Sequence, residues 1–334
     1  MPRLFALLAA ICLLATPLRA ECTGENLLLG QPPAALARLE AELARQPYPT
    51  GNFWRATRPD PAGGEQVLHL IGTYHLGDPR HDAAMAALAP LIASATAVLV
   101  EAGPAEETAL KRAMATDPAM LFITEGPSLL EQLDPGEWQA LAAAMKARGI
   151  PPFMAAKFKP WYVSMMLGIP PCAVNQIAAL NGLDHRVRKA ADAAGVPVRA
   201  LEPYDTLLKV FGALTPEEQL AMIRATLPFE DRAADYAATL ADAYFAEDSR
   251  RVWEFMRLQS HSAPGYTAET ADAEYARMEE VLMAARNRDW LPVLEAAAAR
   301  GPAVAAFGAL HLSGQDGVLH LLEQAGFTLT RLPL

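Results

Sequence analysis

The sequence predicts an α/β fold in which a mixed, mostly parallel central sheet is flanked by helices and carries a large helical insertion or cap. Three observations support this prediction. Apolar segments alternate with helical segments between residues 67 and 100, and the alternation returns between residues 303 and 332. Between these regions, residues 203–300 have a helical composition. Because strands from both ends of the chain must share one sheet, we expect residues 21–334 to form a single domain.

The first strand–helix–strand unit begins at residue 67. Residues 67–71, Val-Leu-His-Leu-Ile, form a short apolar run that indicates a buried strand. The Ala-rich segment 82–93 is predicted to be a helix, and residues 97–100 form a second apolar strand. A strand–helix–strand unit of this length implies parallel pairing, with helices covering the sheet.

Two further regions repeat this pattern. Residues 184–194 are predicted to form a helix that ends at a glycine, and a strand follows at 196–201. Near the C-terminus, residues 303–307 are continuously apolar, residues 316–325 are predicted to be helical, and residues 327–332 alternate as an edge strand does. These segments supply the remaining strands of the predicted sheet.

The stretch from 203 to 300 is predicted to be mostly helical. It contains many Ala, Met, Leu, Glu and Arg residues and few strand signals, and Thr215-Pro216-Glu217-Glu218 is typical of a helix start. No linker or low-complexity segment divides the chain. The stretch is therefore predicted to be an insertion in the α/β domain or a cap on it.

Composition excludes several classes of protein. The chain has 334 residues, of which 52% are hydrophobic, so it can bury a substantial core and is not disordered. Its 38 acidic and 28 basic residues give a formal net charge of −10. This charge repels phosphate backbones, so no nucleic-acid partner is expected.

The N-terminal 20 residues resemble a secretory signal. Arg3 precedes an apolar stretch at 4–14, and a small-residue end follows at Ala20. We expect residues 1–20 to be removed and the mature chain, which begins near Glu21, to be exported, most simply to a periplasm. The stretch is shorter than a spanning helix requires, so no integral membrane span is expected after signal removal. An uncleaved anchor is the alternative.

Two cysteines lie outside this signal. Cys12 is within it, which leaves Cys22 and Cys172 to face an oxidising compartment. An even pair in an exported protein indicates a disulfide. Two separate buried thiols are the alternative. A disulfide here would be structural, since it would tie the mature N-terminus to the middle of the chain.

Two strands end in the same short motif. Gly72-Thr73-Tyr74-His75 follows the first strand, and Gly308-Ala309-Leu310-His311 follows the late apolar run. In open α/β sheets, ligands bind at the carboxyl ends of the strands, where a glycine allows a sharp turn. One such motif arises easily by chance, but two in equivalent positions predict that His75 and His311 face one site.

Two carboxylates also follow strands. Glu101 comes directly after the second strand, one crossover beyond His75, and Glu202 follows the strand at 196–201. A carboxylate in this position is either a solvated loop residue or a group that faces the site. The functional alternative is favoured for Glu101 and the solvated one for Glu202.

Imidazole and carboxylate groups at one site permit two kinds of chemistry. They are suitable ligands for a divalent metal, which would acidify a bound water. A histidine could instead take a proton from water while a glutamate orients it. The sequence lacks the His-Glu-x-x-His, Gly-x-Ser-x-Gly, P-loop and Gly-x-Gly-x-x-Gly motifs, which disfavours the enzymes that use them.

These residues resemble the TraB/PrgY/GumN family, which includes the Tiki metalloproteases and is distantly similar to erythromycin-esterase-like proteins. The resemblance rests on the two Gly-x-x-His motifs and on Val100-Glu101. It covers roughly residues 65 to 315 and has further support from four segments: Lys159-Pro160-Trp161, Gly182-Leu183-Asp184, Leu201-Glu202 and Arg286-Asn287.

The resemblance implies an EreA/ChaN-like fold and a site made of His75, Glu101 and His311. In Tiki-like members this set of residues is associated with metal-dependent peptide cleavage, and in the esterase-like relatives with ester hydrolysis. The implied metal is divalent: manganese, cobalt or zinc. Arg286 would hold an oxyanion or a substrate carboxylate, and Asn287 would support it. Alternatively, the two residues mark a helix C-terminus, where Arg286 is solvated and Asn287 is a cap.

Three functional hypotheses follow. The leading one is an exported hydrolase of peptide or ester bonds, in which His75, Glu101 and His311 hold a metal and Glu101 or Glu202 acts as base. The second is a binding protein that sequesters a peptide, metal or haem-like ligand without turnover. The third is an accessory protein for assembly or polysaccharide export. Lys159 either contacts the substrate or is solvated. The substrate and the oligomeric state cannot be predicted.

Overall fold

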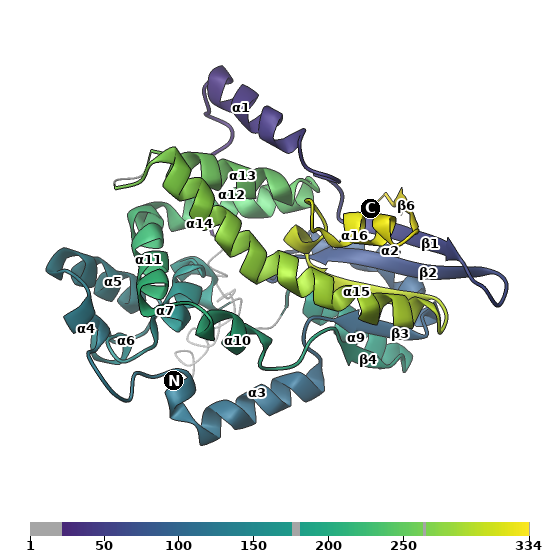
Figure 1. The fold of residues 1–334 in the computed structure, drawn as a ribbon, viewed down its shortest axis with the longest axis horizontal. Coiled ribbons are helices and arrows are strands. Elements are labelled where there is room, and N and C mark those ends of the chain that lie inside the picture. The colour runs from purple at the N-terminus through teal and green to yellow at the C-terminus, as the bar shows by residue number, and fades with distance from the viewer. Residues whose placement is uncertain (1–21, 176–180, 263–264, 334) are drawn as a thin grey trace, which may run out of the picture.

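A computed structural model describes residues 22–175, 181–262 and 265–333 of the chain. The predicted signal, residues 1–20, lies outside them. The described residues form one six-stranded sheet, in the order β4-β3-β5-β2-β1-β6, with helices on both faces and a helical part to one side (Figure 1). The strands are β1 (Phe53–Pro59), β2 (Glu65–Thr73), β3 (Ala97–Val100), β4 (Val198–Ala200), β5 (Ala303–Gly308) and β6 (Thr328–Arg331).

The α-helices lie in three stretches of the chain. Those before β4 are α1 (Pro33–Leu43), α2 (His81–Ser94), α3 (Pro104–Thr116), α4 (Leu129–Gln132), α5 (Pro135–Ala147), α6 (Pro152–Ala155), α7 (Pro160–Leu167) and α9 (Leu183–Ala194). Those between β4 and β5 are α10 (Thr206–Gly212), α11 (Pro216–Thr226), α12 (Ala233–Phe245), α13 (Ser249–Ser260), α14 (Ala268–Glu279) and α15 (Ala285–Ala298). The last is α16 (Val318–Gln324). The predicted α/β class, with a mixed and mostly parallel sheet flanked by helices, is confirmed.

The four strands β4, β3, β5 and β2 run parallel to one another, so their carboxyl ends share one edge of the sheet. β1 pairs antiparallel with β2 and with β6, and β6 is the edge strand on that side of the sheet. Strand β1 was not predicted from the sequence. This strand is partly exposed and carries Arg55 and Arg58, so it lacks the continuous apolar run that identified its neighbours.

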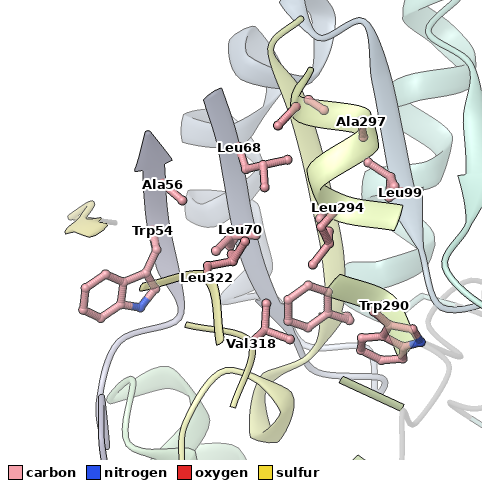
Figure 2. Close-up of a cluster of buried hydrophobic side chains, with 14 of the residues drawn as sticks. Trp54, Ala56, Leu68, Leu70, Leu99, Trp290, Leu294, Ala297, Val318 and Leu322 are labelled. Atoms are coloured by element: carbon pink, nitrogen blue, oxygen red, sulfur yellow. The ribbon is translucent and has the colours of Figure 1, made fainter. Parts of the chain in front are cut away.

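Apolar layers cover both faces of the sheet. In β5, Ala303, Ala305 and Phe307 belong to one buried cluster, whereas Val304 and Ala306 belong to the other. Figure 2 shows the first face, where side chains of β2 and β3 pack against α15 and α16. The second face packs against α2 and α9. Two-sided burial explains why β3 and β5 appear in the sequence as uninterrupted apolar runs.

The helical part has its own core. Side chains of α5, α7 and α11 form a separate buried cluster that includes Leu141, Val163 and Ile223. This part draws on residues 104–167 as well as on the predicted stretch of 203–300. The end of that stretch, α15, instead packs on the sheet (Figure 2). Intrinsic helix propensity could not separate these two environments, because it does not reveal which neighbour a helix contacts.

A disulfide joins Cys22 to Cys172, as predicted, across a sequence separation of 150 residues. Cys172 lies in a 3₁₀ turn, η2 (Pro171–Ala173), which follows α7. The bond therefore ties the start of the described chain to the helical part. Among the described residues, no helix combines the length and apolar character needed to cross a membrane.

Candidate functional site

Four carboxyl ends at one edge of the sheet bring four predicted site residues together. His75 lies two residues after β2, and Glu101 comes directly after β3. Glu202 lies two residues after β4, and His311 ends a 3₁₀ turn, η5 (Ala309–His311), that follows β5. Because β4, β3, β5 and β2 are neighbours in the sheet, these side chains share one region at its edge.

Gly308, the last residue of β5, marks the centre of the site. A Cβ atom at this position would lie 3.5 Å from Oε1 of Glu101, 3.6 Å from Cδ2 of His311 and 3.8 Å from Nε2 of His75. The backbone N–H of Gly308 donates to Oε1 of Glu101 at 2.7 Å. Both histidines of the Gly-x-x-His motifs and the intervening glutamate thus surround a single point.

The other motif glycine, Gly72, permits close packing beneath this point. A Cβ atom on Gly72 would lie 2.7 Å from Cδ1 of Leu312 and 3.0 Å from Cα of Ala309. A side chain here would push the η5 turn away from β2. The glycine therefore allows the turn that carries His311 to lie against the strand that carries His75.

Arg286, in the first turn of α15, is the cation of the site. Its Nε and Nη2 donate to the two oxygens of Glu202 at 2.8 and 2.7 Å, and Nη2 also donates to Oε2 of Glu101 at 2.7 Å. Nη1 donates to the carbonyl of Leu282 at 3.0 Å and to Nε2 of His311 at 3.3 Å. A guanidinium has five N–H donors, and all five are engaged.

This saturation changes the role expected for Arg286. We predicted that it holds an oxyanion or a substrate carboxylate, but in this arrangement no donor is free to do so. The guanidinium instead holds Glu101 and Glu202 in place, and Nε1 of Trp290 adds a bond to Glu202 at 3.0 Å. The carbonyl of Leu282 belongs to a π-helical turn, Glu280–Ala284, directly before α15, and such turns occur often at functional sites.

The environment keeps Glu101 ionised. Burial raises the pKa of its carboxyl group, because a low-dielectric surrounding disfavours charge. The opposing groups are stronger and lower the pKa to about 2: His311, Arg286, His75 and the backbone N–H of Gly308. Glu101 is therefore a carboxylate at any physiological pH.

Asn287 fixes the proton on His311. Its Nδ2 donates to the carbonyls of Asp316, at 2.8 Å, and His311, at 3.3 Å, so its Oδ1 must be the atom that faces Nδ1 of His311 at 2.6 Å. Nδ1 therefore carries the proton, and Nε2 presents a lone pair. Burial first, and then the charges of Arg286 and His75, lower the pKa of His311 to about 3.

His75 differs from His311 in its exposure to solvent and in the direction of its pKa shift. Its side chain is 63% exposed, on the open side of the site, and its Nδ1 lies 3.6 Å from Oδ2 of Asp184. Burial by the surrounding protein lowers the pKa of the His75 imidazole, but Asp184 and Glu101 outweigh this effect and raise the pKa to about 9. The site thus contains one neutral, buried histidine and one that readily holds a proton.

Asp184 was not predicted as a site residue. It lies in the first turn of α9, and Leu183, beside it, donates its backbone N–H to the carbonyl of Tyr74 at 2.9 Å. A Cβ atom on Gly182 would lie 2.3 Å from the carbonyl oxygen of His75, so only glycine allows this approach. The sequence did contain one indication of this residue, because the Gly182-Leu183-Asp184 segment supports the family resemblance. No role in the site was assigned to Asp184 on that basis.

Asn287 and Lys159 were both predicted to contact the substrate, and the structure places them in different surroundings. Asn287 is 2% exposed and orients His311 as described, so it is a positioning residue. Lys159 lies directly before α7 in the helical part. Among the contacts found for the described residues, none joins the Lys159 side chain to the site. The structure therefore gives no support for a substrate contact at either position.

The predicted metal can be tested against the arrangement of its ligands. Within residues 22–175, 181–262 and 265–333, no group of three or more His, Cys, Asp or Glu side chains is arranged to hold a metal ion. Both oxygens of Glu101 already accept hydrogen bonds, and Arg286 faces both Glu101 and Nε2 of His311. A cation bound there would meet a buried guanidinium. The side chains as arranged do not fit a resident metal. The binding of manganese, cobalt or zinc therefore remains a prediction, and it would require these side chains to rearrange.

Comparison with known proteins identifies relatives. The sequence pattern of the TraB/PrgY/gumN family matches residues 52–331, which includes both Gly-x-x-His motifs, Glu101 and Arg286. An uncharacterized protein of Escherichia coli (strain K12), YbaP, is 24% identical over 268 residues, which cover 78% of this chain and 89% of YbaP. YbaP of Shigella flexneri, also described as uncharacterized, matches with the same identity and coverage.

Proposed function

The chain belongs to the TraB/PrgY/gumN family, and on this premise we propose that it hydrolyses a carboxylic ester or peptide bond with a water molecule activated by His75. One observation carries the proposal: Nε2 of His75, Oε1 of Glu101 and the ring of His311 surround Gly308 at the carboxyl end of β5. Acid–base groups at the carboxyl ends of parallel strands are typical of α/β enzymes.

His75 is the group that takes the proton. It is the exposed histidine, so water and substrate can reach it, and Asp184 lies beside its Nδ1. A neutral His75 would accept a proton from water through Nε2, and the resulting imidazolium would be stabilised by Asp184 and Glu101. This is the logic of a histidine–carboxylate pair, in which the carboxylate orients the ring and compensates its charge.

Hydrogen bonds hold the side chains of Glu101 and His311 in fixed positions in the site. Glu101 is held from both sides, by Gly308 and by Arg286, so its carboxylate can accept a hydrogen bond from the attacking water without moving. His311 stays neutral, with its Nδ1 proton held by Asn287 and its Nε2 accepting a hydrogen bond from Arg286, so its ring is fixed as well. Such fixed polar groups lower the cost of reorganisation during the reaction.

The test is a panel of p-nitrophenyl esters and fluorogenic peptides, assayed with the wild type and with His75→Ala. We expect the variant to lose activity by about 10²–10⁴-fold, the usual contribution of a general acid–base group. His320→Ala is the control, because this histidine lies on α16, outside the site. Wild-type turnover by His75→Ala would contradict the proposal, and saturable binding with unchanged ligand recovered would favour a binding protein.

Metal dependence is tested on the same substrates. The wild type is assayed before and after dialysis against a chelator, and its metal content is measured by mass spectrometry. We expect turnover to survive chelation, because the proposed proton acceptor is a side chain. Loss of turnover that manganese, cobalt or zinc restores would show instead that the three side chains rearrange around a metal.

We also propose that the protein is exported to a periplasm or an equivalent oxidising compartment. The signal-like pattern at residues 1–20 supports this, and so does the disulfide, since such bonds persist mainly in oxidising compartments. Fractionation of cells, with the N-terminus determined by mass spectrometry, tests it. The expected result is a chain that begins near Glu21 in the periplasmic fraction, and a full-length cytosolic chain with free thiols would refute it.

A further inference from the structure

An apolar cavity of about 610 Å³ lies in the helical part. Its walls come from α7 and from the helices α10 to α14, and its lining includes Leu167, Phe211, Met222, Tyr236, Trp253 and Met278. Cavities that bind small ligands typically measure about 300–1,000 Å³ and are lined mainly by hydrophobic and aromatic side chains. The cavity therefore has the size and the lining of a ligand site.

This cavity borders the catalytic site. Tyr74 and Leu76, which flank His75 in the chain, both line it. Leu282 also lines it, and the carbonyl of the same residue accepts a bond from Arg286. His75 itself is not part of the wall. A ligand that fills the cavity would thus end beside the site without covering the reacting group.

Three of the four charged residues of the wall, Glu230, Glu218 and Arg277, have ionic partners. Glu230 accepts hydrogen bonds from both Nη atoms of Arg148, at 2.6 and 3.0 Å, and Glu218 lies 3.9 Å from Arg277. Much of the remaining surface is hydrocarbon, aromatic ring and thioether, and methionine side chains adapt readily to flexible ligands. This lining favours an apolar chain over a charged peptide.

A second hollow lies beside the cavity and shares part of its wall. It measures about 670 Å³, shares Ala221, Tyr266 and Glu274 with the cavity wall, and includes the exposed pair Glu137 and Arg224. The cavity thus borders both the site, through Tyr74 and Leu76, and this second hollow, through Ala221 and Tyr266. A ligand held in the cavity could place one end beside His75.

We propose that the cavity binds a long apolar acyl group, so that the substrate is an ester or amide of a fatty-acyl type. This inference rests on the proposed function and names its substrate class. The carbonyl carbon would lie beside His75 with the chain in the cavity. Water adds its oxygen to that carbon, the bond to the alcohol or amine oxygen or nitrogen breaks, and the leaving group receives a proton.

The catalytic test uses p-nitrophenyl esters from acetate to palmitate. We expect kcat/KM to rise at least tenfold from acetate to laurate in the wild type. Ala237→Trp, on α12, fills the cavity and should lower kcat/KM for laurate at least tenfold while acetate is unchanged. Ala225→Trp, on α11, repeats the test from another wall. Ala238→Trp, one position along α12 and outside the wall, is the control and should behave as the wild type.

A binding assay separates this inference from the proposed function. The fluorescent fatty acid cis-parinaric acid is titrated into the wild type, His75→Ala and Ala237→Trp. Saturable binding by the first two, weakened at least tenfold in Ala237→Trp, supports the cavity even if no ester is hydrolysed. Turnover of acetate esters without fatty-acid binding, or binding that Ala237→Trp leaves unchanged, overturns the cavity assignment and leaves the proposed function standing.

Discussion

The sheet and the helical part are stabilised in different ways. The residues of β5 are divided between two apolar layers, and residues 303–307 are almost completely buried. The helical part instead contains a cavity of about 610 Å³ and is tied by polar and covalent links, such as Arg148 and the Cys22–Cys172 bond. The difference teaches that the sheet, which is buried on both faces, fixes the strand ends that carry His75, Glu101 and His311, whereas the helical part leaves room for a ligand.

The largest expected effect on stability lies at the edge of the sheet. Arg286→Met removes the cation between Glu101 and Glu202, whose side chains are 24% and 10% exposed. Two buried carboxylates then lie close together with no cation between them, so we expect the free energy of unfolding to fall by about 3–5 kcal/mol. Urea unfolding followed by circular dichroism measures this change.

Arg288→Met is the matched control, two positions along α15. Arg288 forms ion pairs with Glu280 and Asp316, but these side chains are 44–46% exposed, so we expect a loss below about 1 kcal/mol. Equal losses for the two variants would show that the cation at the sheet edge does not organise the site.

The next effect concerns the helical part. Replacing both Cys22 and Cys172 by serine removes a link across 150 residues, and we expect a loss of about 2–4 kcal/mol. Because the sheet has its own core, amide exchange should increase in α7 and much less in β2 and β5. A uniform increase over both parts would contradict the distinction between them.

A smaller effect is a shift in the dependence of activity on pH. His75 must be neutral to accept a proton and its pKa is raised to about 9, so kcat/KM should rise with pH and level off above about 9. Asp184→Asn removes a group that raises this pKa, so the plateau should begin at a lower pH. Activity that instead falls above pH 9 would assign His75 the role of a general acid.

The sequence predicted the sheet better than the helical part. β2, β3 and β5 are buried on both faces, so each appears as an apolar run, whereas the half-exposed β1 does not. The helices of residues 104–167 could not be assigned to the same part as those of 203–284. Their shared core depends on contacts distant in sequence, such as those of α7 with α11.

The site shows a similar division. His75, Glu101 and His311 were predictable because strand ends in a parallel sheet lie at one edge. Asp184 was not, since it reaches His75 from the start of a helix. The role of Arg286 depends on how many of its donors are engaged, which only side-chain geometry reveals.

The most direct test of the coupled site is a titration of the histidine rings by ¹⁵N NMR. The structure predicts that His75 titrates near pH 9 and that His311 stays neutral, with its proton on Nδ1, down to about pH 3. Glu101→Gln should lower the pKa of His75, because Glu101 raises it. Two histidines that both titrate near 6.5, unaffected by Glu101→Gln, would contradict a shared site.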